Sequence, residues 1–394
     1  MTTTSDARRH QQSLPVPATA RPHDLHWIRG ALQSAIAIEH ATMPLYSAAM
    51  YSLEVQNYPA YNTLRSVLME EMLHMAAMCN ALAAVGGRPR IRSLDPSAVL
   101  HGLPGLVTGL RARLAPLSRR QLEVFMSIEG PDELSPPPAD DRVGYASIGA
   151  FYRAIREAVE KNAAAVAAAC RGRQHANQVG GNLGYRVVRP TGDPVEQILA
   201  SIDLVIDQGE GAGGSTRSAG PPSDEELSHY ARFAELRYGR GYTGPAAHEA
   251  AGPGRRSEGQ RRWFRGPSLS WPRVINTLAV PRDGYRALLA VDPRRGEVEP
   301  RLRQFDEAYT RMLAALDDAW NGPPEEGWPA LGRAVLEMNE LRVISCFEIV
   351  RQQVPGDVVG RITELYPQEA MELGALTDLS APVYYGPRFE NRGL

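Results

Sequence analysis

The tetrapeptide Glu71-Met72-Leu73-His74 decides the fold class when it is read with Glu39, which lies on the preceding apolar stretch. A spacing of three residues puts the Glu71 carboxylate and the His74 imidazole on one face of a helix. In four-helix carboxylate proteins, Glu-x-x-His on one helix faces an inward Glu from a neighbouring helix, and together they hold metal ions. The pattern therefore predicts an all-α bundle with a metal site in its core.

These three residues lie on apolar stripes that repeat with helical periodicity. The first predicted helix spans about residues 24–51, and the second runs from about Pro59 to a stop at Gly86-Gly87. An unpaired buried charge is costly, so two carboxylates and a histidine in such a seam indicate a bound cation. The alternative is that Glu39 lies at the edge of its stripe and that Glu71 and His74 satisfy one another.

Two further candidates for ligands lie later in the chain: Glu210, at the close of the fourth predicted helix, and His229, early in the fifth. Taken alone, Glu226 and His229 also fit a helix cap. Glu70 and Glu71 differ by about 100° around their helix. Only Glu71 is therefore expected to face the site, and replacing Glu70 is expected to be mild.

The remaining elements follow from the same periodicity and from helix-end signals. Helices are expected at about 147–170, from the N-cap Asp193 to 211, from Ser223 through Leu236, at about 299–320 and 328–353, and after Pro355. Loop-rich stretches are expected at 87–144 and 239–298, and no alternating pattern predicts a strand. The expected parts are a disordered tail at 1–22, a metal-binding bundle at 23–240, a loop-rich connection at 241–298, and a C-terminal helical region at 299–394 packed on the bundle.

Composition excludes several classes of protein. The 43 basic residues nearly balance the 45 acidic ones, so no nucleic-acid or membrane-surface partner is expected. The chain has a single lysine, Lys161, which is not part of the Gly-Lys-Ser/Thr sequence that a Walker loop requires. A pyridoxal enzyme would have to form its Schiff base with this one lysine. Glycines at 209, 211 and 214 match a dinucleotide fingerprint, but a helix rather than a strand precedes them.

The three cysteines, Cys79, Cys170 and Cys346, are far apart in the sequence. They form neither a disulfide framework nor a thiolate zinc site. Residues 1–22 lack the apolar core of a signal peptide, and no segment has the length of a membrane span. A cytoplasmic protein is expected, with a small molecule as its partner; a homodimer is compatible with the sequence.

Several stretches together resemble a known family, the ferritin-like domain of the iminophenylpyruvate dimer synthases. They are Ile38-Glu39-His40-Ala41-Thr42-Met43-Pro44-Leu45-Tyr46, Glu70-Glu71-Met72-Leu73-His74-Met75, Gly86-Gly87-Arg88-Pro89, Ser147-Ile148-Gly149-Ala150-Phe151-Tyr152, Gln208-Gly209-Glu210-Gly211 and His229-Tyr230-Ala231-Arg232-Phe233. The similarity covers about residues 25–240. It implies an all-α, ferritin-like helical bundle with additional C-terminal helices and long irregular loops. It also implies that the metal ligands are Glu39, Glu71, His74, Glu210 and His229.

One position departs from that family. The family usually has Glu where this chain has Ala150, and Glu157 is a poor substitute on helical phase. If the usual Glu is a ligand, one metal ion is weakened or absent. If it belongs to a capping box with Ser147, its loss costs about 1 kcal/mol of helix stability.

The sequence thus predicts a metal-dependent oxidase or oxygenase that acts, with dioxygen, on a small organic and amino-acid-derived substrate in specialised metabolism. Iron is the expected cofactor, as one or two ions with manganese as the alternative, because hard oxygen ligands stabilise the oxidised metal. Tyr46 and Tyr230 are expected to orient ligands or substrate. The rival hypothesis, which the change at Ala150 favours, is a non-catalytic metal-binding or structural partner of a biosynthetic complex.

Overall fold

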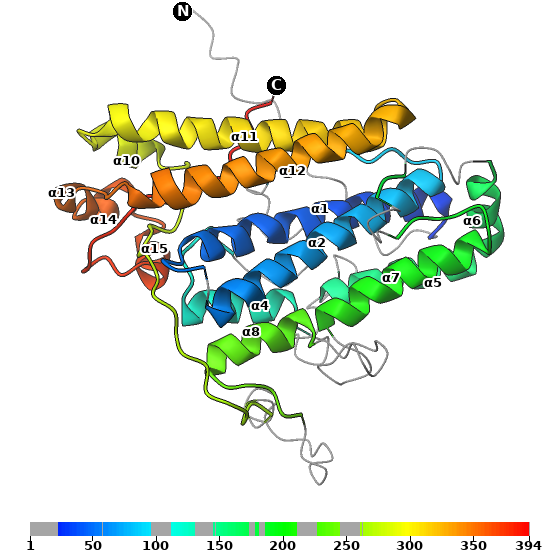
Figure 1. The fold of residues 1–394 in the computed structure, drawn as a ribbon, viewed down its shortest axis with the longest axis horizontal. Helices are drawn as coiled ribbons and strands as arrows, with labels where there is room; N and C mark the ends of the chain where they lie inside the picture. Colours follow the sequence, from blue (N-terminus) through cyan, green and yellow to red (C-terminus); the bar gives the residue numbers. More distant parts are fainter. Residues whose placement is uncertain are drawn as a thin grey trace, which may run out of the picture.

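The computed structural model describes residues 23–56, 58–95, 112–130, 145, 147–172, 178–180, 186–210, 227–244, 261 and 263–393. Its helices lie in three layers (Figure 1). The predicted all-α fold class is confirmed. The tail predicted at 1–22 lies outside the described residues.

The middle layer consists of the two long helices that the sequence predicts, α1 (Leu25–Tyr51) and α2 (Pro59–Ala84). Asp24 caps α1, because its carboxylate accepts a backbone N–H of the first turn at 2.8 Å. Pro59 takes the first position of α2, where a backbone N–H would have no helical partner. Gly86 follows α2 with a φ of 78°, a left-handed conformation that glycine adopts without strain.

A second layer covers one side of α1 and α2. It consists of α4 (Arg119–Ile128), α5 (Ile148–Lys161), α6 (Ala163–Cys170), α7 (Pro194–Glu210) and α8 (His229–Tyr238). Within this layer α5 packs on α7 and α4 packs on α8. Because α5 also contacts α1, and α7 and α8 contact α2, the layer closes a bundle around the inner faces of the two long helices.

Two predictions for this layer need correction. Helix α4 falls within the stretch 87–144, which the sequence predicts to be loop-rich without naming a helix there, and it buries Leu122, Phe125 and Ile128. The helix predicted at 147–170 is divided between α5 and α6 at Asn162. Asn162 leaves the helical conformation, with φ of −110° and ψ of 23°, and its side-chain amide donates to the Ala158 carbonyl at 2.8 Å in addition to its backbone N–H.

The fifth predicted helix begins at His229, so the expected start at Ser223 is wrong. Ser228 is its N-cap, and the Ser228 hydroxyl accepts the backbone N–H of Ala231 at 3.3 Å. Ser223 and Glu226 lie outside the described residues, while Leu227 and Ser228 are not helical. Ser223 fits the capping-box pattern with Glu226, whereas Ser228 has Ala231 three residues later, so sequence spacing favours the wrong serine.

A third layer, formed by the C-terminal part of the chain, covers the other side of the long helices (Figure 1). Its main helices are α11 (Arg295–Asn321) and α12 (Gly327–Val343), joined by the short turn Pro324–Glu326. A π-helical turn (Ile344–Glu348) and a 3-10 turn (Ile349–Arg351) extend α12. The smaller helices are α10 (Arg286–Val291), α13 (Gly356–Val359), α14 (Ile362–Leu365) and α15 (Ala370–Leu376).

The sequence places the start of α11 too late. The helix begins at Arg295 rather than 299 and contains Pro300, which removes one backbone hydrogen bond without ending it. The short helix α10 lies in the stretch 239–298, where only loops are expected. A six-residue helix is too short for apolar periodicity to distinguish it from a loop.

Buried polar contacts join the C-terminal layer to the middle layer. Nε2 of His40 on α1 lies 2.7 Å from the Tyr309 hydroxyl on α11. The indole N–H of Trp320 donates to Asn80 of α2 at 2.8 Å. Buried apolar residues from all three layers belong to one continuous hydrophobic cluster, so the C-terminal helices are part of the wall around the bundle.

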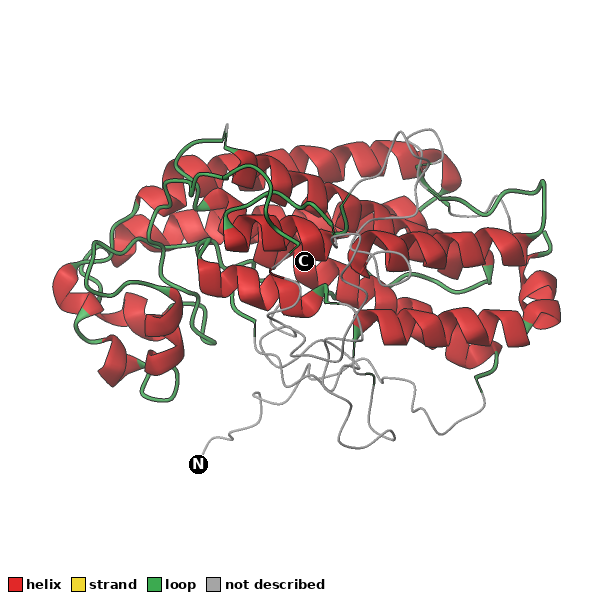
Figure 2. Ribbon diagram, turned by 90° about the horizontal axis from the view of Figure 1, so that it is seen from below, coloured by secondary structure: helices red, strands yellow, loops and turns green. Residues whose placement is uncertain are grey.

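Figure 2 shows helices and loops only, and the described residues contain four isolated β-bridges but no strand. Among these residues, no helix combines the length and the apolar character that a membrane crossing requires.

Candidate metal centre

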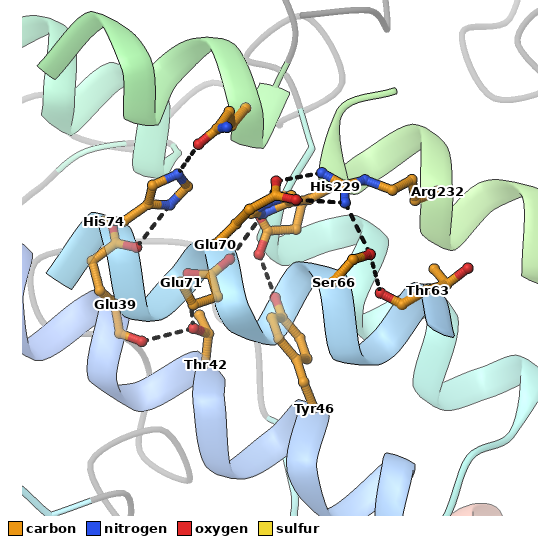
Figure 3. A network of polar contacts seen from close by, with 12 residues as sticks. Glu39, Thr42, Tyr46, Thr63, Ser66, Glu70, Glu71, His74, His229 and Arg232 are labelled. Atoms are coloured by element: carbon orange, nitrogen blue, oxygen red, sulfur yellow. Dashed lines mark hydrogen bonds and ion pairs between the residues drawn. The ribbon is translucent and has the colours of Figure 1, made fainter. Parts of the chain in front are cut away.

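Five buried side chains from four helices converge inside the bundle (Figure 3). Glu39 comes from α1, Glu71 and His74 from α2, Glu129 from the C-terminal cap of α4, and His229 from the first position of α8. They form two groups whose potential ligand atoms lie within 4.8 Å of one another. We name Glu39, Glu71 and His74 centre A, and Glu71, Glu129 and His229 centre B. Glu71 belongs to both.

In each centre a histidine nitrogen faces carboxylate oxygens. Nδ1 of His74 lies 3.4 Å from Oε2 of Glu39 in centre A. In centre B, Nδ1 of His229 lies 2.9 Å from Oε1 of Glu71 and 3.4 Å from Oε2 of Glu129. The two imidazole rings are stacked with their centroids 5.5 Å apart. The Nδ1 atoms and the three carboxylates therefore enclose one small polar volume.

A hydroxyl group holds one oxygen of each carboxylate. Tyr152 donates to Oε1 of Glu39, and Tyr46 donates to Oε1 of Glu129. Thr42 donates to Oε2 of Glu71 at 3.2 Å. The opposite oxygen of each carboxylate faces a histidine or the space between the centres. Hydrogen bonds of this kind orient a ligand before a metal ion binds.

The outer nitrogens of the two histidines contact different groups. Nε2 of His74 lies 2.7 Å from the amide oxygen of Gln208 on α7. Nε2 of His229 lies 2.9 Å from Oε2 of Glu70 on α2. Glu70 is held in turn by Arg232, which also donates to Ser66 at 3.1 Å (Figure 3). Since an amide oxygen and a carboxylate only accept, both Nε2 atoms carry the proton and both Nδ1 atoms face inward.

Burial and mutual repulsion control the protonation of the carboxylates. Burial, followed by repulsion from Glu129 and Glu39, raises the pKa of Glu71 to about 8. Burial opposes the ionisation of Glu39, but its contacts with His74 outweigh burial, so the pKa of Glu39 is lowered. Two carboxylates so close together share protons rather than ionise independently.

The histidines respond in the opposite sense. Burial alone would lower the pKa of His229, but its close contacts with the carboxylates of Glu129, Glu70 and Glu71 raise it well above its usual value. The pKa of His74 is also raised, because Glu39 outweighs burial. Near neutral pH the metal-free centre therefore holds protons in the place of a cation.

The donor set fits a metal ion. Oε1 of Glu71 and Nδ1 of His229 are both buried and have no hydrogen-bond partner, because their contact of 2.9 Å lacks the geometry of a hydrogen bond. An orphaned pair of this kind is costly in a protein interior. A divalent cation between carboxylate oxygens and imidazole nitrogens would satisfy both atoms. Within the described residues, no arginine or lysine contacts Glu39, Glu71 or Glu129.

A small cavity adjoins the centres. Its free volume is ≈ 20 Å³, which is room for about one water molecule. The polar end is formed by Glu39, Thr42, Glu71, His74, Glu129 and Tyr152, and the remaining lining residues are Ile38, Ile148, Gly149, Val205, Ile206 and Gly209. A Cβ on Gly209 would lie 3.5 Å from Oε2 of Glu129, so α7 passes directly beside the carboxylates.

The structure brings four of the predicted ligands together: Glu39, Glu71, His74 and His229. Glu210 is the last residue of α7, but its side chain lies outside the described part of the chain.

The two predicted tyrosines are placed differently. Tyr46 contacts Glu129 in centre B. Tyr230 packs in a separate apolar cluster with Ala234 and Phe264 and does not line the cavity.

The expectation for Glu70 needs correction. As predicted from helical phase, Glu71 rather than Glu70 faces the centres. Glu70 is nevertheless only 8% exposed and holds both His229 and Arg232. Burial raises the pKa of Glu70, but His229 and Arg232 outweigh it and lower the pKa to about 2. We therefore expect that replacing Glu70 is not mild, because it would leave the buried side of Arg232 without its carboxylate.

Sequence reasoning misses Glu129, Tyr152 and Gln208. Glu129 ends an amphipathic stretch with Leu122, Phe125 and Ile128, but the proline-rich residues that follow suggest a loop throughout. Tyr152 lies one residue after the buried Phe151 and also faces inward.

Comparisons with known proteins agree with this geometry. A family model described as ferritin-like matches residues 32–238, which is more than half of the chain. The crystal structure of a ferritin-like protein from Caulobacter vibrioides has a TM-score of 0.58 and 22% sequence identity, covering 86% of this chain and 99% of that chain. At this identity the similarity bears on the fold alone. Among curated proteins, none matches the sequence significantly.

Proposed function

Since this chain belongs to the ferritin-like family, we propose that it is a metal-dependent oxidase or oxygenase with a two-ion centre. Glu39, Glu71, His74, Glu129 and His229 would hold the ions, and Glu71 belongs to both groups of potential ligands. The observation that carries the proposal is the orphaned contact between Oε1 of Glu71 and Nδ1 of His229, inside a cluster of three buried carboxylates.

Iron is the metal that this donor set suits best, and manganese is the alternative. Three carboxylates and two imidazoles are hard or intermediate donors, and the cluster has no thiolate. When bound, iron supplies the one-electron chemistry that allows dioxygen to oxidise an organic molecule. The protein contributes fixed ligands: Thr42, Tyr46 and Tyr152 hold the outer carboxylate oxygens, so the inner oxygens need no reorientation.

The change at Ala150 does not argue for a non-catalytic protein in this arrangement. Gly149 and Tyr152 line the cavity on α5, whereas Ala150 does not. The cap residue of α4, Glu129, brings a carboxylate to the centres from another helix. We propose that these three carboxylates and two histidines hold two ions without a ligand at position 150.

The cavity indicates the class of substrate. Its non-ligand walls are Ile38, Ile148, Val205 and Ile206 together with two glycines, so they offer apolar surface and little hydrogen bonding. A largely apolar organic molecule would suit the chemistry of these walls, but the free volume of ≈ 20 Å³ holds about one water molecule, so the walls would have to move apart to admit it. The resemblance to the ferritin-like domain of the iminophenylpyruvate dimer synthases supports an amino-acid-derived substrate in specialised metabolism.

Metal analysis combined with dioxygen uptake tests the proposal. Protein purified without chelator is expected to contain about one or two iron or manganese ions per chain. After anaerobic loading with iron(II), the wild type is expected to consume dioxygen, while Glu71→Gln is expected to bind no metal and to consume none. If no metal binds, the proposal is wrong and only the fold remains. If iron binds but dioxygen is not consumed, the protein is a non-catalytic metal-binding partner.

A further inference from the structure

The two histidines of the centres differ in what lies behind them. Glu70 behind His229 is a carboxylate, and it is fixed by two guanidinium nitrogens of Arg232. Gln208 behind His74 is a neutral amide on α7. Both partners accept the Nε2 proton and so select the same tautomer, but only Glu70 is a carboxylate, whose charge Arg232 partly offsets.

That charge changes the strength of the ligand. A carboxylate that accepts the outer proton of an imidazole raises the basicity of the inner nitrogen, and losing such a partner typically costs about 10-fold to 100-fold in metal affinity. An amide oxygen polarises the ring much less, because it carries only a partial charge. Nδ1 of His229 is therefore the stronger donor of the two, and it faces centre B.

The cavity distinguishes the centres in a second, independent way. All three residues of centre A, Glu39, Glu71 and His74, line the cavity. In centre B only Glu71 and Glu129 line it, while His229 is fully buried behind them, with 0% of its surface exposed. An ion in centre A would border this cavity through all three of its ligand residues, whereas an ion in centre B would border it through two.

We propose, on the basis of the proposed function, that the two centres are unequal and that Glu70 is the positioning residue responsible. Centre B binds the first ion tightly and retains it. Centre A binds the second ion more weakly, at the wall of the substrate cavity. Glu70 acts through His229 and does not contact the ions, and Gln208 is the matching residue that keeps centre A weaker.

Cobalt(II) titration of the metal-free, full-length protein tests this inference, because its visible absorption reports ligand geometry without turnover. The wild type is expected to bind two ions in two steps, the first about 10-fold or more tighter than the second. Glu129→Gln should remove the tighter step and Glu39→Gln the weaker one, since each residue belongs to one centre only.

Variants of the two outer residues then test the cause. Glu70→Gln should weaken the tighter step by about 10-fold to 100-fold and leave the weaker step unchanged. Gln208→Glu, at a half-buried position on α7, should strengthen the weaker step and leave the tighter one unchanged. This second variant keeps the test decisive if Glu70→Gln does not fold, because Gln208 has no buried guanidinium depending on it.

Two results would overturn the inference while leaving the proposed function intact. The first is a wild type whose two steps are equal. The second is a well-folded Glu70→Gln or Gln208→Glu that changes both steps to the same extent or neither. A wild-type protein that binds no cobalt(II) and no iron(II) would instead overturn the proposed function itself.

Discussion

Two regions of the molecule bury acidic side chains, and they do so in different ways. In the C-terminal layer, Asp306 of α11 is fully buried, but Arg388 reaches it with Nη2 at 2.7 Å and Nε at 2.8 Å. Arg392 lies at 3.4 Å, and the backbone N–H of Glu390 donates at 3.1 Å. This carboxylate therefore has a permanent cation and a full set of donors.

The centres contain the opposite arrangement. Glu39, Glu71 and Glu129 are buried beside two histidines whose charge depends on pH, and two buried polar atoms there have no hydrogen-bond partner. A structural ion pair brings its own counterion, as at Asp306. A buried carboxylate cluster that lacks its own counterion depends on a cation from solution.

The largest expected effect is the loss of all metal when Glu71 is replaced. Glu71→Ala removes the ligand that the two centres share, so metal content should fall from about two ions per chain to none. The exposed Glu157→Ala serves as control and should keep the wild-type content. Elemental analysis after loading with iron(II) measures both. If Glu71→Ala retains its ions, the buried carboxylate cluster does not depend on a cation held by Glu71.

The second largest effect is a loss of unfolding free energy when the ion pair of the C-terminal layer is broken. Asp306→Ala leaves Arg388 buried without its carboxylate, which is expected to cost about 3–5 kcal/mol of unfolding free energy. Glu307→Ala, at the neighbouring exposed position, is expected to change it by less than about 0.5 kcal/mol. Urea unfolding of the metal-free proteins gives both values. An Asp306→Ala variant as stable as Glu307→Ala would show that the ion pair does not hold this region together.

A change of pH should affect metal-free and metal-loaded protein in opposite directions. The pKa of Glu71 is raised to about 8 and that of His229 is raised as well, so the folded metal-free protein binds protons that the unfolded chain releases. Its unfolding free energy should therefore fall as pH rises from about 5 to about 8, by up to about 1.4 kcal/mol per pH unit for each proton.

With metal bound, the same ligands are deprotonated, so raising the pH over this range should strengthen metal binding and stabilise the protein. Denaturation at several pH values, in chelator and in excess manganese(II), compares the two slopes. The pKa of Glu70 is lowered to about 2, so Glu70 stays ionised in the folded protein over this pH range and does not change the two slopes. Slopes of the same sign would mean that protons do not replace the cation in the metal-free centre.

Much of the fold can be predicted from the sequence because its long helices carry both periodicity and end signals. Asp24, Pro59 and Gly86 mark helix ends, and each acts where the pattern places it. The weaker predictions fail where two signals compete. Asn162 leaves the helical conformation and divides one predicted helix, and Ser228 rather than Ser223 caps α8.

The residues of the candidate site can likewise be predicted where they lie on long periodic helices and not where they lie on short ones. Glu39, Glu71 and His74 can be found because they lie on apolar stripes at helical spacing. Glu129 cannot, because it lies at the end of a short helix beside a proline-rich stretch, and only the packing of α4 on α8 brings it to His229. The role of Glu70 also cannot be predicted from the periodicity of α2 alone, because it depends on the position of His229 on α8.

The smallest effect concerns Ala150, where a new carboxylate could act either as a ligand or as a charge at a helix end. Ala150 is the third residue of α5, its backbone N–H donates to the Ser147 hydroxyl at 2.9 Å, and the first turn of α5 has no acidic residue. The cavity is lined by Gly149 and Tyr152, so position 150 is rotated away from it. Ala150→Glu should therefore stabilise the protein by about 0.3–1 kcal/mol through the helix dipole and leave the metal content unchanged.

Ala154→Glu, one turn later on α5, is the matched control and should gain less, because the dipole acts mainly on the first turn. Thermal unfolding and cobalt(II) titration of both variants decide between the two roles: an additional or tighter bound ion in Ala150→Glu alone would mean that this carboxylate reaches the centres and that the wild-type site lacks a ligand.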